Sequence, residues 1–136
     1  MVKDMLNLEI VTPEKRVLSE TVDSVTIPTA SGEVGILTNH VPLISSLKAG
    51  VLAYTKSGAT ERMVVASGFV EVSQNNVSIL ADTAETVSEI DVETARAERD
   101  SLEKELGASK DSLEESESAR ERLEKAQARL ALASGR

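Results

Sequence analysis

The residues of this sequence that could carry chemistry are few. It has one histidine, His40, and no cysteine. Disulfides, and metal sites that need several His or Cys ligands, are therefore excluded. His40 could act as a base beside a nucleophilic serine, but no Gly-x-Ser-x-Gly motif accompanies it, and neither glycine-rich phosphate motif is present. These residues predict a binding or structural module and not an enzyme.

Charged residues offer a second kind of chemistry, the binding of charged partners. The 136-residue chain has a net charge of −8, which argues against nucleic acid and anionic lipid surfaces as partners. Residues 88–117 carry −7 and residues 118–136 carry +3. Two interpretations stay open for the basic stretch: it pairs with the acidic one, or it also meets an acidic partner protein. Its basic side chains include Arg120, Arg122, Lys125 and Arg129.

Residues 1–87 predict a β-domain that would present such groups. Short runs alternate apolar and polar residues, as at 6–10, and all three prolines and most glycines lie in this half. The runs 60–66 and 69–73 are expected as two strands, and Pro28 as the end of another. Many short, half-buried strands, about ten here, indicate a β-sandwich or barrel.

Residues 88–136 are rich in Glu, Arg, Ala, Ser and Leu, which favour helix. Apolar residues recur at 3-4 spacing and predict helices over about 91–106 and 112–133. The short connection makes them an antiparallel hairpin. The expected fold class is α+β, with a 1–87 β-domain followed by an 88–136 regulatory hairpin. Because its apolar stripes are narrow and rich in Ala, the hairpin should bury little area and dock in more than one place.

The ends of these helices carry local signals. Ser88 and Asp91 resemble a capping box, and Asp91 is an equally good N-cap by itself. Gly107 is a natural stop for the first helix. Ser112 and Glu115 form a second capping box at the start of the other helix.

Three segments carry a resemblance to a known family. Residues 31–43 read SGEVGILTNHVPL and resemble the signature of ATP synthase epsilon subunits, except that Thr38 and Val41 replace the usual Pro and Ala. Residues 67–72, SGFVEV, and 77–85, VSILADTAE, are similar to the second signature of that family. The resemblance covers nearly the whole chain in order.

The resemblance implies a non-catalytic central-stalk subunit of a proton-translocating ATP synthase of bacterial or chloroplast type. In that family the sandwich clamps the gamma subunit and lies on the c-ring. The residues implied at this rotor interface are Glu33, Gly35, Asn39, His40 and Pro42. From its loop position alone, His40 is either an ordinary polar residue or a contact residue.

The hairpin is implied to inhibit ATP hydrolysis by extending along gamma toward the alpha and beta subunits. The implied contacts there are Arg120, Arg122, Lys125 and Arg129. The protein would associate with a membrane only through the complex, at the cytoplasmic face of the plasma membrane or the stromal or cytoplasmic face of a thylakoid. The alternative is a free-standing adaptor, a β-sandwich with a coiled-coil tail, unrelated to ATP synthase.

Some bacterial members of the family bind ATP on the folded hairpin through a compact Ile-Asp-x-x-Arg-Ala motif. Here Ile90-Asp91 and Arg96-Ala97 are two residues further apart, a spacing closer to photosynthetic-type members. Weak ATP binding would use Asp91, Arg96, Lys125 and Arg129; the other interpretation makes the basic three helix-surface salt-bridge residues. No other cofactor and no metal is implied. The sequence leaves open whether protons or sodium ions drive the complex.

Overall fold

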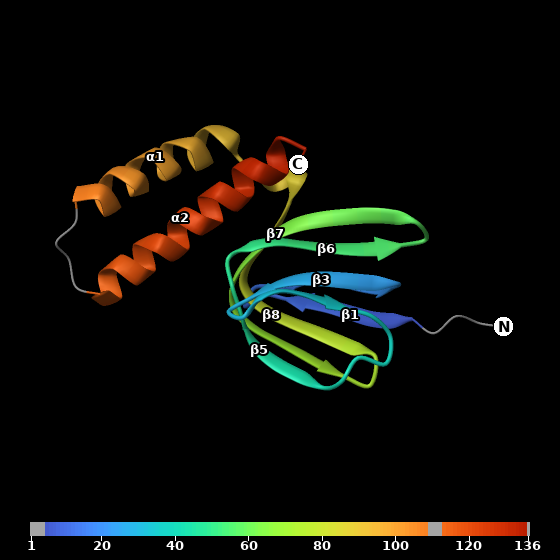
Figure 1. The fold of residues 1–136 in the computed structure, drawn as a ribbon. Helices are drawn as coiled ribbons and strands as arrows, with labels where there is room; N and C mark the ends of the chain where they lie inside the picture. The colour runs from blue at the N-terminus through green and yellow to red at the C-terminus, as the bar shows by residue number, and fades with distance from the viewer. Residues whose placement is uncertain (1–4, 109–112, 136) are drawn as a thin grey trace.

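The computed structural model describes residues 5–108 and 113–135, with side chains for all of these except Ala108 and residues 113–116. In this part of the chain, eight strands and a short 3-10 turn precede two α-helices (Figure 1). The expected class, a β-sandwich followed by a helical hairpin, is confirmed. The elements are β1 (Leu6–Val11), β2 (Arg16–Val22), β3 (Ser24–Thr29), β4 (Gly32–Ile36), β5 (Leu43–Leu47), β6 (Gly50–Lys56), β7 (Ala59–Ser73), β8 (Asn76–Thr86), η1 (Val87–Glu89), α1 (Val92–Ala108) and α2 (Leu113–Ala133).

The strands form a single sheet in the order β2-β1-β8-β7-β5-β3-β4, with β6 paired to both β3 and β7. Strands β1 and β8 run parallel, and the other pairs are antiparallel. The first part of β7 pairs with β6, and its last part pairs with β5. Because β7 and β8 bend midway, the sheet folds over on itself and encloses the core between two layers.

The bend in β7 lies at Ser67 and Gly68, where φ is 58° and 139°. A Cβ on Gly68 would lie 1.8 Å from the carbonyl oxygen of Leu80 on β8. Only glycine lets the two backbones approach this closely. These residues turn the strand without ending it, so the two strands predicted at 60–66 and 69–73 are one.

Two other sequence predictions about strands need correction. Pro28 lies inside β3, opposite Glu33 of β4, and does not end the strand. Strand β5 was not predicted, because its Ser45 and Ser46 leave no clear apolar run. With β7 continuous, the described residues form eight strands and not about ten.

The core consists of the inward-facing residues of both layers. Alternation is clear in β1, where Leu6, Leu8 and Ile10 are buried and the residues between them are more exposed. Around Met63–Ala66 of β7 the alternation stops, and four consecutive residues are buried. Met63 and Val65 belong to the sandwich core, whereas Val64 packs with the helices on the outer face. This part of β7 is therefore covered on both sides.

The hairpin is docked on the sandwich. Buried Ala128 and Leu132 of α2 pack on Val64, with Val51 and Ile90 at the margin. Helix α2 lies between α1 and the strands (Figure 1). The two helices contact each other along their length, and Ala95, Leu102, Ala119 and Ala126 are buried on them. The prediction that the hairpin buries little apolar area agrees with this small contact.

The helix-end signals had mixed outcomes. Asp91 caps α1, since the Thr94 N–H donates to its Oδ1 at 3.1 Å. The Ser88 capping box is wrong, because Ser88 lies inside the 3-10 turn η1 and the carboxylate of Glu89 accepts from Thr86. Gly107 does not stop α1, which continues to Ala108. The box predicted at residues 112–115 has no test here, because residue 112 and the side chains of 113–116 lie outside the described part of the chain.

Candidate functional site

The loop of residues 37–42 is anchored at the end of the sandwich where β7 turns into β8. Asn39 has a positive φ of 64°, a conformation that asparagine tolerates, and its N–H donates to Oδ1 of Asn75 at 2.7 Å. The carbonyl of Asn75 accepts from the N–H of Asn7 at 2.8 Å. The loop, the β7–β8 turn and the start of β1 thus meet at one end.

The residues predicted at a rotor interface lie on this loop and the strand before it. Glu33 and Gly35 are exposed on β4, and Asn39 and Pro42 are exposed in the loop; His40 is half-buried. Nδ1 of His40 lies 2.7 Å from the carbonyl oxygen of Val41, and its backbone N–H donates to Leu37 at 3.3 Å. These five residues do not share one edge, because Glu33 lines a hollow with Glu124 and Ala128 of α2, whereas Asn39 is bonded to Asn75 at the β7–β8 turn. Their contact role stays a prediction.

A set of exposed apolar side chains, which we call the apolar face, lies partly on the loop and partly on β5, β7 and β8. On the outer surface of neighbouring strands, Phe69 of β7 is 59% exposed and its cross-strand neighbour Leu80 of β8 is 55% exposed. Ile44 of β5 is 76% exposed and lies opposite Glu71, two residues from Phe69. The apolar face consists of Leu37, Val41, Ile44, Phe69 and Leu80.

A surface cavity of about 310 Å³ adjoins part of the apolar face between β1, β7 and β8. Val11, Pro13, Phe69 and Leu80 are among its lining residues. Sequence reasoning missed the apolar face. The signal was available in the alternation of β7 and β8, because Val70 and Val72 are buried and Phe69 lies on the opposite side of the strand, as Leu80 does between buried Ile79 and Ala81.

A second set of contacts joins the hairpin to the sandwich and centres on Arg129 of α2. Its Nε and Nη2 each lie 2.7 Å from Oε1 of Glu85 on β8, and its Nη1 lies 3.5 Å from Oε2 of Glu98 on α1. Side-chain exposure is 17% for Arg129 and 20% for Glu85. One guanidinium therefore connects three elements: the sandwich, α1 and α2.

Two further contacts join α2 to the bend of the sandwich. Nζ of Lys48, between β5 and β6, lies 3.5 Å from Oε2 of Glu124. The hydroxyl of Ser67, at the bend in β7, donates to the carboxylate of Glu121. Two acidic residues of α2, Glu121 and Glu124, thus contact the sandwich.

The other predicted basic residues of α2 lie beside these contacts. Arg120 and Arg122 are exposed, and Lys125 is half-buried. Arg122 and Lys125 line a cavity of about 290 Å³ against Ser67 and Thr83 of the sandwich. The side chains of Arg120 and Arg122 are therefore accessible while the hairpin is docked, and their contact role stays a prediction.

Three of the four residues predicted to hold ATP are engaged in separate contacts. Arg129 binds Glu85 and Glu98, as described. Nη1 of Arg96 lies 3.3 Å from Glu93 one turn earlier on α1. Asp91 caps α1, and the N–H of Thr94 that it accepts lowers the pKa of its carboxyl. The salt-bridge interpretation of Arg96 and Arg129 matches this geometry, and ATP binding stays a prediction.

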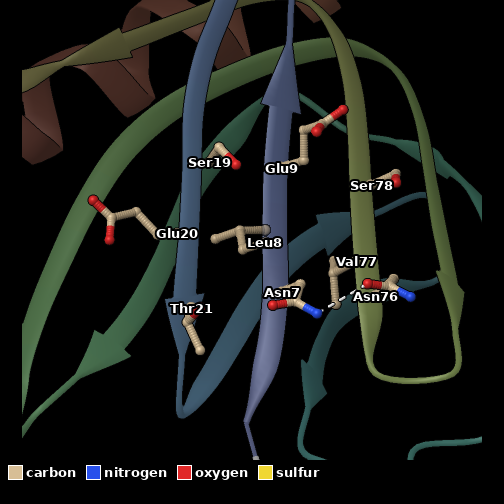
Figure 2. A pocket seen from close by; sticks show the side chains of 9 residues that line it. All are labelled: Asn7, Leu8, Glu9, Ser19, Glu20, Thr21, Asn76, Val77 and Ser78. Carbon is tan, nitrogen blue, oxygen red and sulfur yellow. Dashed lines mark hydrogen bonds between the residues drawn. The ribbon is translucent and has the colours of Figure 1, made fainter.

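A shallow polar groove crosses the outer face of β2, β1 and β8, with a volume of about 320 Å³. Figure 2 shows Asn7 donating to Oδ1 of Asn76 at 3.1 Å across it. Its two carboxylates have basic partners, Glu9 with Arg16 at 3.7 Å and Glu20 with Lys56. No cluster of three metal-ligating side chains occurs among residues 5–108 and 113–135. Neither described helix is long and apolar enough to cross a membrane.

The comparisons with known proteins agree on one family. Residues 5–87 match the model of the ATP synthase Delta/Epsilon chain β-sandwich domain. The chain is 47% identical over 131 residues to the ATP synthase epsilon chain of Syntrophobacter fumaroxidans, covering 96% of each. It is 48% identical over 99 residues to that of Desulfitobacterium hafniense strain Y51, covering 73% of this chain and 75% of the relative.

A solved structure shares the fold. A chain of the Euglena gracilis mitochondrial ATP synthase, from an assembly of OSCP, F1 and the c-ring, superposes with a TM-score of 0.82 at 23% identity; the match covers 100% of this chain and 84% of that one. The family model and the relatives exclude the adaptor unrelated to ATP synthase. Its β-sandwich, its helical hairpin and its relatives place this chain in the ATP synthase epsilon chain family.

Proposed function

We propose that this chain is a non-catalytic subunit of the central stalk, which couples rotation of the c-ring to the catalytic head through the gamma subunit. The observation that carries the proposal is the apolar face. Five large apolar side chains are each more than half exposed on and beside one layer of the sandwich. Leaving such residues in water is unfavourable, and a group of them marks a surface that a partner covers.

The position of the apolar face supports gamma as that partner. Phe69, Leu80 and Ile44 lie on the outer side of β7, β8 and β5, whereas Val64 on the earlier part of β7 is covered by α2. A partner can therefore cover the apolar face while the hairpin stays docked. A stable stalk contact would need this independence, because coupling must persist whatever the hairpin does.

The loop at 37–42 supports a second contact, with the c-ring. Asn39, His40 and Pro42 lie in a loop that the hydrogen bond from Asn39 to Asn75 holds in place at the end of the sandwich. A rotor that transmits torque needs an anchored contact and not a freely moving loop. Glu33 and Gly35, the other two predicted residues, precede this loop on β4. Association with a membrane is then indirect, through the complex alone.

The hairpin is the inhibitory element in this proposal. Its small apolar contact with the sandwich, through Val64, Ala128 and Leu132, supports a second position for it. Arg120 and Arg122 are already exposed, and Lys125 and Arg129 would become available on release. In the released position these cations would meet acidic segments of the alpha and beta subunits and block hydrolysis. ATP binds the docked hairpin only weakly, since Arg129 is occupied by two carboxylates.

The test of the stalk contact is the binding of purified gamma subunit to Phe69→Asp. We expect this variant to lose binding at least about tenfold, since a buried, unpaired carboxylate is costly at an interface. The matched control is Ser19→Asp, which adds the same charge at an exposed position on β2. Equal binding by Phe69→Asp and the control would remove the apolar face from the proposal.

A further inference from the structure

The docked hairpin has little apolar contact to hold it in place. The apolar cluster between α2 and the sandwich contains three buried residues, Val64, Ala128 and Leu132. Only Val64 is completely buried. The sandwich core, in contrast, is one cluster to which all eight strands contribute buried residues. Because apolar stabilisation scales with buried area, α2 needs other interactions to stay docked.

The ion pairs that could supply them differ greatly in exposure. The side chains of Arg16 and Glu9 are 65% and 43% exposed, and those of Arg96 and Glu93 are 52% and 88% exposed. Pairs as exposed as these contribute little to stability. The side chains of Arg129 and Glu85 are 17% and 20% exposed and share two contacts of 2.7 Å. Charge-assisted bonds that are paired and shielded in this way are the stronger kind.

The connectivity of Arg129 is as informative as its burial. Through Glu85 it holds α2 on β8, and through Glu98 it holds α1 on α2. The remaining polar contacts between α2 and the sandwich, Lys48 with Glu124 and Ser67 with Glu121, involve more exposed groups. Losing Arg129 would therefore weaken two interfaces at once.

We infer that Arg129 is an ionic latch: its bonds to Glu85 and Glu98 hold the hairpin on the sandwich without any ligand, so ionic strength controls release. If the hairpin inhibits hydrolysis as proposed above, opening of the latch would release the inhibitor. The latch itself can be tested in the isolated chain. Raising salt from 0.1 M to 1 M shortens the screening length from about 10 Å to about 3 Å, which weakens exposed ion pairs strongly and the more shielded bonds of Arg129 by a smaller amount. The latch therefore opens progressively with salt.

The experiment measures docking directly in the isolated full-length chain. The protein has no cysteine, so spin labels can be placed at Ser19→Cys on β2 and Ala131→Cys on α2, both exposed positions. A docked hairpin gives one narrow distance distribution by pulsed electron paramagnetic resonance, and a released hairpin gives a broad one. The two populations yield a docked-to-released ratio.

We expect Arg129→Gln to lower this ratio by at least about tenfold, as for a lost hydrogen-bonded charge pair. The matched control is Arg99→Gln, which removes the same charge from the hairpin but only an ion pair with its neighbour Asp100; it should change the ratio less than about twofold. Raising salt should release the unsubstituted hairpin and have a much smaller effect on Arg129→Gln.

A second substitution keeps the inference falsifiable if Arg129→Gln misfolds. Glu85→Gln removes the same bond from the sandwich side and should also release the hairpin, and the double variant should lose less than the two single effects combined. Equal ratios for Arg129→Gln and Arg99→Gln, or purely additive effects of Arg129→Gln and Glu85→Gln, would overturn the latch. Neither result depends on ATP hydrolysis, so failure of the latch is distinguishable from failure of the inhibitory function.

Discussion

Replacing Gly68 with alanine should destabilise the sandwich at its bend far more than the size of one methyl group implies. The added Cβ would lie 1.8 Å from the carbonyl oxygen of Leu80 and 2.8 Å from its carbonyl carbon. Both are backbone atoms, which cannot rotate away, so β7 and β8 must separate locally. The residue would also keep a φ near 139°, a conformation that L-residues rarely adopt.

The expected loss combines two costs. Holding a non-glycine residue in that conformation costs about 1–3 kcal/mol. Separating the strands weakens about two ladder hydrogen bonds, at about 1 kcal/mol each. The sum is about 3–5 kcal/mol, out of a typical stability of about 5–15 kcal/mol for a whole domain. With a urea slope of about 2 kcal/mol per M, the midpoint of unfolding should fall by about 2 M.

The matched control is Gly58→Ala in the turn between β6 and β7. Gly58 also has a positive φ, 81°, but a Cβ there would meet nothing within 4 Å. Gly58→Ala should lower the free energy of unfolding only by the cost of the positive φ, about 1–2 kcal/mol. Urea unfolding of both variants, followed by circular dichroism, separates the strain from the clash. Equal losses would refute the idea that the Leu80 backbone makes glycine necessary at the bend.

Two further predictions concern the hairpin. The pKa of Asp91 is lowered by its cap bond from Thr94, so the cap contributes fully above the unfolded value of about 3.9 and is lost as pH falls through the lower folded value. Asp91→Asn keeps a capping side chain without the titration, so its far-ultraviolet circular dichroism should fall less on acidification; identical acid profiles would contradict the assignment. When ATP is titrated into the isotopically labelled chain, the amide resonances of the hairpin in nuclear magnetic resonance spectra should shift with a dissociation constant of about 1 mM or weaker. A dissociation constant below about 0.1 mM would contradict the conclusion that Arg129 is occupied by its two carboxylate partners.

Local sequence patterns predicted those parts of the fold that local physics determines. Strand β1 follows strict alternation, and the Asp91 cap needs only a carboxylate before a helical run. The continuous β7 could not be predicted, because Ser67 and Gly68 have the composition of a turn and only the approach of β8 turns them into a bend. The position of Pro28 inside β3 could not be predicted either, because it depends on the pairing of Pro28 with Glu33 of β4, which is not a local feature of the sequence.

The candidate site divides along the same line. The residues predicted at the rotor interface could be proposed because the family resemblance covers one continuous segment, from Glu33 to Pro42. The apolar face joins three strands, and Arg129 lies 44 residues from Glu85, so neither has a local signature. Charge patterning did predict that the basic stretch at residues 118–136 would meet acidic groups. One of these groups, Glu85, lies on the sandwich itself.

The central claim is that the sandwich couples rotation to the catalytic head, while the hairpin inhibits ATP hydrolysis. The most direct test compares ATP hydrolysis by the synthase complex assembled with the full chain and with residues 1–87 alone. The shorter chain retains the apolar face and the five residues predicted at the rotor interface. Binding of gamma should be unchanged while hydrolysis rises in the complex that lacks the hairpin. An unchanged hydrolysis rate, with the shorter chain shown to be bound, would contradict the inhibitory role of the hairpin.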